Sequence, residues 1–160
     1  MDRKIVQETG FRVMGIETRT NNAREMTGAG RIAELWGRFF QENLLARIPN
    51  KLDHAILALY TDYSGDQDGE YTLMIGARVA SSEHAVPGTV ARNVPSGRYA
   101  VFQSEKGPAD KVVPAVWMEI WSVPKGEPGG DRTFIADYEV YDARAANPQD
   151  AQVDVYVGIR

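Results

Sequence analysis

The order of hydrophobic patterns along this chain repeats once, at a period of about 80 residues. Each half contains an extended β-rich segment, an amphipathic helix and two strands. In the first half these segments are 4–20, 29–48, 54–63 and 71–79, and in the second half they are 90–103, 112–123, 132–141 and 152–160. Pro114 is tolerated only in the first turn of a helix, which places it near the start of the second helix.

Residue types also correspond between the two halves. The clearest matches are Trp36 with Trp117, Gly76 with Gly158, and Tyr60 and Tyr63 with Tyr138 and Tyr141. On the tyrosine alignment, the first half has Thr61 where the second half has Glu139. The carboxylate is therefore an addition to one half of a shared framework.

A duplicated unit of this size predicts one α+β domain spanning residues 1–160, with pseudo-repeats 1–80 and 88–160. Each half is too small to cover its own sheet, so the halves should join into one antiparallel sheet with two main helices packed on it. A pseudo-two-fold axis between the halves would then create a ligand groove.

Composition excludes several kinds of chemistry. The chain contains no cysteine, which excludes disulfides, thiolate nucleophiles and cysteine-based metal sites. The two histidines, His54 and His84, have no metal-ligand spacing, and no motif indicates a cofactor. A net charge of −4 disfavours nucleic acid as a direct partner, because phosphate binding needs a basic surface.

Targeting signals are also missing from the pattern. The N-terminal residues lack the apolar core of a signal peptide, and no apolar run reaches the length of a membrane span. We therefore expect a cytoplasmic protein without a membrane partner.

One strand of the second half carries the most informative residue. Glu139 lies between Tyr138 and Val140 in "TFIADYEVYDAR", and alternation places it on the face of Ile135, Asp137 and Tyr141. A lone strand glutamate is usually exposed to solvent. On the alternative interpretation it lines an aromatic cavity, where low dielectric and ring faces would favour an incoming cation. The local pattern leaves both interpretations open.

Several segments together resemble a known family: "GFRVMGIETRT", "IAELWGRFF", "YTDYSGDQDGEYTLMIG", "VPSGRYAVF", "VWMEIW", "FIADYEVYD" and "VDVYVGIR". This combination is similar to the GyrI-like effector-binding domain of AraC-type and MerR-type bacterial regulators, and most of all to the stand-alone form encoded by integron cassettes. The resemblance covers essentially the whole chain. It implies a duplicated strand-helix-strand-strand fold with a ligand groove between the halves.

The resemblance also implies a site. In drug-binding members, a buried glutamate of the penultimate strand receives cationic compounds within an aromatic pocket, and Glu139 occupies the matching position. Tyr156 in the last strand matches a pocket tyrosine less securely. Further lining candidates are Trp36, Tyr60, Trp117, Trp121 and Tyr141.

Three functions follow from the resemblance. The first is non-enzymatic binding of cationic lipophilic compounds. The chain begins too close to its first strand for a DNA-binding helix-turn-helix, so we do not expect it to act on DNA directly. A separate transcription regulator would then be its protein partner. The second is hydrolysis of reactive cyclopropane-type toxins by Glu139 and a nearby tyrosine. The third, inhibition of DNA gyrase, rests on fold analogy alone.

Overall fold

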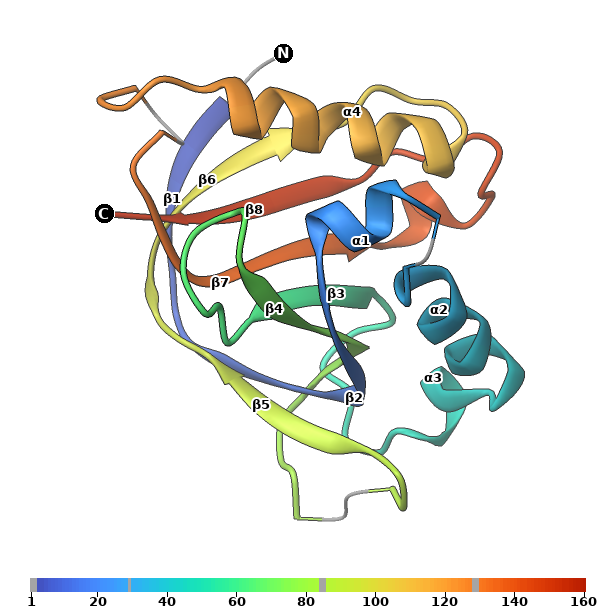
Figure 1. The fold of residues 1–160 in the computed structure, drawn as a ribbon. Coiled ribbons are helices and arrows are strands. Elements are labelled where there is room, and N and C mark those ends of the chain that lie inside the picture. The colour runs from blue at the N-terminus through green and yellow to red at the C-terminus, as the bar shows by residue number, and fades with distance from the viewer. Residues whose placement is uncertain (1–2, 29, 84–85, 128–129) are drawn as a thin grey trace.

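A single eight-stranded antiparallel sheet forms the framework of the protein (Figure 1). The computed structural model describes residues 3–28, 30–83, 86–127 and 130–160. The strands are β1 (Arg3–Glu8), β2 (Phe11–Asn21), β3 (Ile56–Thr61), β4 (Glu70–Val79), β5 (Val90–Val94), β6 (Gly97–Gln103), β7 (Arg132–Tyr141) and β8 (Asp154–Ile159). Their order across the sheet is β1-β6-β8-β7-β3-β4-β2-β5, which confirms the predicted α+β class.

The two halves meet where β3 pairs with β7 at the centre of the sheet. The first strand of each half pairs with a strand of the other half: β1 pairs with β6, and β5 pairs with β2. The first extended segment therefore divides at Thr9 and Gly10, and the fifth divides at Pro95 and Ser96. Sequence patterning predicted each of these segments as one element, because alternation along a strand does not reveal where its pairing partner changes.

Strand pairing corrects the predicted match between Glu139 and Thr61. Tyr60 pairs with Leu73, three residues before Gly76, and Glu139 pairs with Val155, three residues before Gly158. The equivalent of Glu139 is therefore Tyr60. The tyrosine alignment was displaced by one position, and such a slip moves every side chain to the opposite face of the sheet.

Gly15 and Gly76 lie opposite each other in the β2–β4 pair, where the two backbones come unusually close. A Cβ atom on Gly15 would lie 2.0 Å from the carbonyl oxygen of Ile75, and one on Gly76 would lie 2.0 Å from that of Met14. Only glycine fits such an approach.

Two main helices, α2 (Ile32–Gln41) and α4 (Ala109–Ser122), cover one face of the sheet (Figure 1). The shorter elements are α1 (Asn22–Met26), α3 (Leu44–Arg47) and η1 (Ala143–Ala145). Residue 29, where the first helical segment was predicted to begin, lies outside the described residues. The prediction that Pro114 lies in a first turn is wrong, because α4 begins at Ala109 and Pro114 falls inside it. None of the described helices has the length and apolar content needed to cross a membrane.

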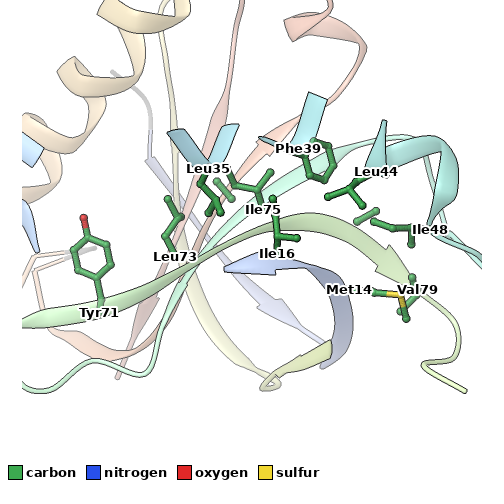
Figure 2. Close-up of a cluster of buried hydrophobic side chains, with 12 residues drawn as sticks. Met14, Ile16, Leu35, Phe39, Leu44, Ile48, Tyr71, Leu73, Ile75 and Val79 are labelled. Atoms are coloured by element: carbon green, nitrogen blue, oxygen red, sulfur yellow. The ribbon is translucent and has the colours of Figure 1, made fainter. Parts of the chain in front are cut away.

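Apolar side chains of α2 pack onto the first half of the sheet (Figure 2). Leu35 and Phe39 of α2 are buried against Ile16 and Ile75 of the strands beneath them. The carboxylate of Glu25 fixes the start of this helix, because it accepts hydrogen bonds from the backbone N–H groups of Arg31 and Ile32.

A second cluster lies beneath α4, where Val116 and Ile120 pack against Val155 and Val157 of β8. A third cluster, on the other face of the sheet, includes Tyr138. Between the first and second clusters, beneath the two helices, the packing leaves a cavity.

Candidate ligand-binding site

The cavity has a volume of ≈ 1420 Å³ and lies between the helices and the centre of the sheet, where both halves contribute to its wall. This volume exceeds the upper end of the usual range for small-molecule pockets, about 1,000 Å³. The wall is mostly aromatic and aliphatic. A few charged side chains also line it: several carboxylates, among them Glu139, and two arginines.

Glu139 is only 3% exposed. Glutamate side chains are rarely buried to this extent, because they usually carry a charge. It lies on β7 between Ala58 of β3 and Val155 of β8, and these small neighbours leave its side chain room on the cavity face. The solvated interpretation of this residue is therefore excluded by its burial.

Three uncharged donors bind the Glu139 carboxylate. The Tyr60 hydroxyl donates to Oε2 at 2.8 Å, and the Trp117 indole N–H donates to the same oxygen at 2.7 Å. The Tyr141 hydroxyl donates to Oε1 at 2.6 Å. Among the residues that the structure describes, no cation forms an ion pair with this carboxylate.

Burial raises the pKa of Glu139 above its ordinary value, and the hydrogen bonds from Tyr141, Trp117 and Tyr60 partly offset this rise. Burial, together with the nearby Glu139 charge, also raises the pKa of Tyr60 and of Tyr141 well above the usual range. Both hydroxyls therefore stay protonated at neutral pH and act as donors.

Aromatic rings from both halves surround this group. Tyr60 contacts Trp117 of α4 with ring centroids 5.0 Å apart, and Tyr141 contacts Trp36 of α2 at 4.9 Å. Trp121 lies 6.4 Å from Trp117 along the same helix. Electron-rich ring faces of this kind attract organic cations.

The structure brings most of the predicted residues together. Those that line the cavity are Trp36, Tyr60, Trp117, Trp121, Glu139 and Tyr141. Tyr156 does not join them. It stacks on Tyr138 at 4.6 Å in the cluster on the opposite face, because Val155 and Val157 occupy the cavity-side positions of β8.

Sequence reasoning missed a buried ion pair in the same wall. Arg132 donates from Nη2 to Oδ2 of Asp137 at 2.7 Å, and both side chains are almost fully buried. Tyr63 also donates to Asp137. The position of Asp137, two residues before Glu139, indicated a shared face, but nothing in the alternation indicated Arg132.

The cause is an irregularity in β7 between Arg132 and Asp137, where Phe134 has a φ of 53°. Alternation predicted that Ile135 would lie on the face of Glu139. Instead, Ile135 is 57% exposed, and Arg132 reaches the cavity wall.

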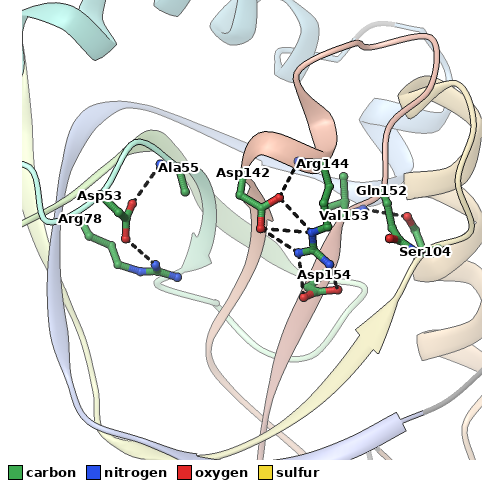
Figure 3. Close-up of polar contacts among 9 residues, drawn as sticks. All are labelled: Asp53, Ala55, Arg78, Ser104, Asp142, Arg144, Gln152, Val153 and Asp154. Atoms are coloured by element: carbon green, nitrogen blue, oxygen red, sulfur yellow. Dashed lines mark hydrogen bonds and ion pairs between the residues drawn. The ribbon is translucent and has the colours of Figure 1, made fainter.

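Ion pairs also fix the chain segments around the cavity (Figure 3). Asp53 accepts from the Arg78 guanidinium at 2.9 Å, and both residues line the cavity. Arg144 bridges Asp142 at 2.8 Å and Asp154 at 3.0 Å, which ties the end of β7 to the start of β8. The Arg144 hydrogen bonds lower the pKa of Asp142. These carboxylates are therefore already paired, unlike Glu139.

Metal binding finds no support in the described part of the chain, where no cluster of three or more suitable side chains occurs. His54 lies exposed at the cavity wall. His84 lies outside the described residues.

Known proteins match this chain over almost its full length. A family model described as an integron-associated effector-binding protein matches residues 4–159. YobU of Bacillus subtilis, a protein assigned to transcriptional regulation, is 38% identical over 151 residues, which cover 93% of this chain and 92% of YobU.

Two solved structures share the fold. The integron cassette protein VCH_CASS2 of Vibrio cholerae has a TM-score of 0.76 and 26% identity, with 99% of this chain and 95% of that chain covered. SAV2435, solved in complex with tetraphenylphosphonium, has a TM-score of 0.74 and 18% identity, with 100% of this chain and 94% of that chain covered.

Proposed function

This chain belongs to the integron-associated effector-binding protein family, and we propose that its cavity binds lipophilic organic cations without transforming them. The observation that carries this proposal is the state of Glu139. It is a buried carboxylate in an aromatic cavity, and its only partners among the described residues are uncharged donors.

An incoming cation would supply the opposite charge that Glu139 lacks. Attraction between charges strengthens where protein excludes water, because the effective dielectric constant is lower there. Each ring face in good contact with the cation adds about 0.5–2 kcal/mol. Such a site selects for charge and for flat apolar bulk, and it imposes few directional requirements.

Tetraphenylphosphonium carries one positive charge surrounded by four flat phenyl rings, and it is the ligand in the SAV2435 structure, whose fold this chain shares. This likeness supports the choice of ligand class, whereas the argument for a cation in this chain rests on its own carboxylate and rings.

The same geometry favours binding over hydrolysis. A general base needs a carboxylate oxygen that can reach the attacking water. The hydrogen bonds from Tyr141, Trp117 and Tyr60 favour the ionised form of Glu139 and so weaken it as a base. Neither Tyr60 nor Tyr141 is available as a base, because burial raises the pKa of both hydroxyls. If the protein consumed an electrophilic ester or cyclopropane and the Glu139→Gln variant did not, this choice would be reversed.

Fluorescence titration with a rhodamine dye tests the assignment of Glu139. We expect Glu139→Gln, which keeps the shape and removes the charge, to weaken binding by about 10–100-fold, because it replaces a charge-assisted contact with a neutral one. Glu34→Gln is the matched control, because Glu34 is exposed on α2 and does not line the cavity. Equal dye affinity in the Glu139→Gln variant and the unmodified protein would refute the proposal.

The proposal also covers the cellular location and the protein partner of the chain. We place the chain in the cytoplasm, where the ligand-bound form would act on a separate transcription regulator. The assignment of its relative YobU to transcriptional regulation supports this extension. Co-purification of a DNA-binding protein in the presence of the dye, but not in its absence, would provide the test.

A further inference from the structure

Three exposed apolar side chains lie at the mouth of the cavity. Met26 at the end of α1, Phe40 of α2 and Met118 of α4 are 78%, 62% and 67% exposed, and all three line the cavity. They are also the most exposed large apolar side chains in the described part of the chain. The others of this kind do not line the cavity: Ile5, Leu52, Val90 and Ile135. Exposed apolar residues scattered singly are common, but a group of them at one opening marks a binding surface.

Helix α2 contributes only apolar side chains to the cavity wall: Ile32, Ala33, Trp36 and Phe40. Trp36 and Phe40 are four residues apart, so they lie one above the other on the same face of the helix. The carboxylates and arginines that line the cavity belong to other elements. A ligand group that lies along α2 therefore contacts apolar surface and no charge of this helix.

A continuous row of rings connects Glu139 to the mouth along this helix. The Tyr141 hydroxyl donates to Oε1 of Glu139, and the Tyr141 ring lies 4.9 Å from the ring of Trp36. Trp36 in turn stacks on Phe40, with ring centroids 5.8 Å apart and 22° between the ring planes. A ligand group that extends from Glu139 along this row reaches Phe40 after these two ring-to-ring steps.

From this arrangement we propose that Phe40 selects ligands by length, because it binds the far end of an apolar arm on the same ligand whose cationic group faces Glu139. This inference rests on the proposed function and adds a ligand feature to it. The preferred ligand is an elongated lipophilic cation, with its charge near one end and an alkyl or aryl arm that spans the row of rings. The flexible side chains of Met26 and Met118 adapt the mouth to arms of different shape.

The size of the cavity supports an elongated ligand. Its volume of ≈ 1420 Å³ exceeds about 1,000 Å³, the upper end of the range for sites that enclose a drug-sized molecule. A compact cation beside Glu139 would leave much of the apolar wall in contact with water. An arm along α2 removes this surface from water, so affinity should rise with each methylene group that becomes buried.

Alkyltriphenylphosphonium ions that differ only in the alkyl chain test the length preference. The methyl compound is too short to extend from Glu139 to Phe40, whereas an octyl chain can span the row of rings. We expect the octyl compound to displace the rhodamine dye from the unmodified protein at a concentration at least about tenfold lower than the methyl compound. Equal affinity for the two compounds would overturn the proposal.

Variants separate Phe40 from the general lipophilicity of the octyl chain. In Phe40→Ser the octyl advantage should shrink by about fivefold or more, while the affinity for the methyl compound stays within about twofold of that of the unmodified protein. Phe40→Leu keeps an apolar side chain and should retain most of the octyl advantage. Leu52→Ser is the matched control, because Leu52 is 58% exposed and does not line the cavity. An octyl advantage that is the same in Phe40→Ser and Leu52→Ser would overturn the assignment of Phe40.

Two further outcomes would assign the mouth differently and so overturn the proposal. An octyl advantage that Met118→Ser removes and Phe40→Ser does not would place the arm along α4. If Phe40→Ser leaves every phosphonium affinity unchanged but abolishes the dye-dependent co-purification of a DNA-binding protein, the mouth would be a contact for that protein instead.

The methyl compound distinguishes failure of this inference from failure of the proposed function. If it does not displace the dye from the unmodified protein, or if it binds the Glu139→Gln variant equally well, the cation site itself fails. Glu139-dependent binding of the methyl compound without an octyl advantage refutes selection by length alone.

Discussion

Tyr141→Phe removes one hydroxyl group from the cavity and keeps the ring that packs against Trp36. That hydroxyl is the donor to Oε1 of Glu139, at 2.6 Å, whereas Tyr60 and Trp117 both donate to Oε2. The substitution therefore leaves Oε1 without a hydrogen bond from the described residues while the shape of the wall changes little.

The size of the effect follows from the loss of one charge-assisted hydrogen bond. Such bonds contribute about 1.5–3 kcal/mol, and 1.36 kcal/mol corresponds to one pKa unit. Because this bond favours the ionised form, its loss should raise the pKa of Glu139 by about one to two pH units beyond the rise that burial already causes.

Cationic dye affinity measured across a pH series reports this change. The ionised carboxylate binds the cation, so affinity increases as pH rises through the pKa of Glu139, and the midpoint should move upward in the Tyr141→Phe variant. Tyr63→Phe is the matched control, because its hydroxyl donates to Asp137 and not to Glu139. A midpoint that moves by less than about 0.3 pH units, or that moves equally in both variants, would refute the reasoning.

Three further predictions concern stability and placement. Because the native pKa of Glu139 is raised, the free energy of unfolding should fall as pH rises from 4.5 to that native value, and denaturant titration of Glu139→Gln should show a smaller fall. Gly76→Ala should lower the free energy of unfolding by at least about 2 kcal/mol, because the new Cβ atom would collide with the backbone of Met14. Gly37→Ala on α2 is the control: nothing lies within 4 Å of its Cβ position, so it should raise the free energy of unfolding by about 0.5–1 kcal/mol. An unchanged free energy of unfolding in Gly76→Ala would contradict the backbone contact. Tyr156→Phe should leave dye affinity unchanged, and a loss of more than about threefold would place that residue in the site after all.

Sequence periodicity was sufficient for the class of fold and for its duplication. The amphipathic stripe containing Leu35 and Phe39 defined a helix, and the glycines at 76 and 158 related the last strands of the two halves. Patterning could not show that β1 and β5 pair with the opposite halves, because the apolar faces of edge strands look alike whichever neighbour they have.

Sequence analysis identified Glu139 and the aromatic residues around it in the cavity wall, but it missed Arg132. Burial of Glu139 among aromatic residues follows from the family resemblance, whereas strand alternation left a solvated and a buried Glu139 both open. Tyr156 lies in the cluster on the opposite face of the sheet, because adjacent residues of one strand point to opposite sides. The sequence pattern did not place Arg132 in the cavity wall, because the irregularity in β7 at Phe134 is a local backbone conformation that the spacing of side-chain types does not encode.

If the cavity binds cations as proposed, the equivalence of Tyr60 and Glu139 explains why the site needs two unlike halves on one polypeptide. A symmetric homodimer of either half would place identical residues beside its dyad. Two glutamates there would repel each other and would lack their hydroxyl donor, while two tyrosines would carry no charge to attract a ligand. Fusion within one chain allows an acid and its donor to occupy the two equivalent positions, so under the proposed function the asymmetry of this central pair is what would attract the ligand.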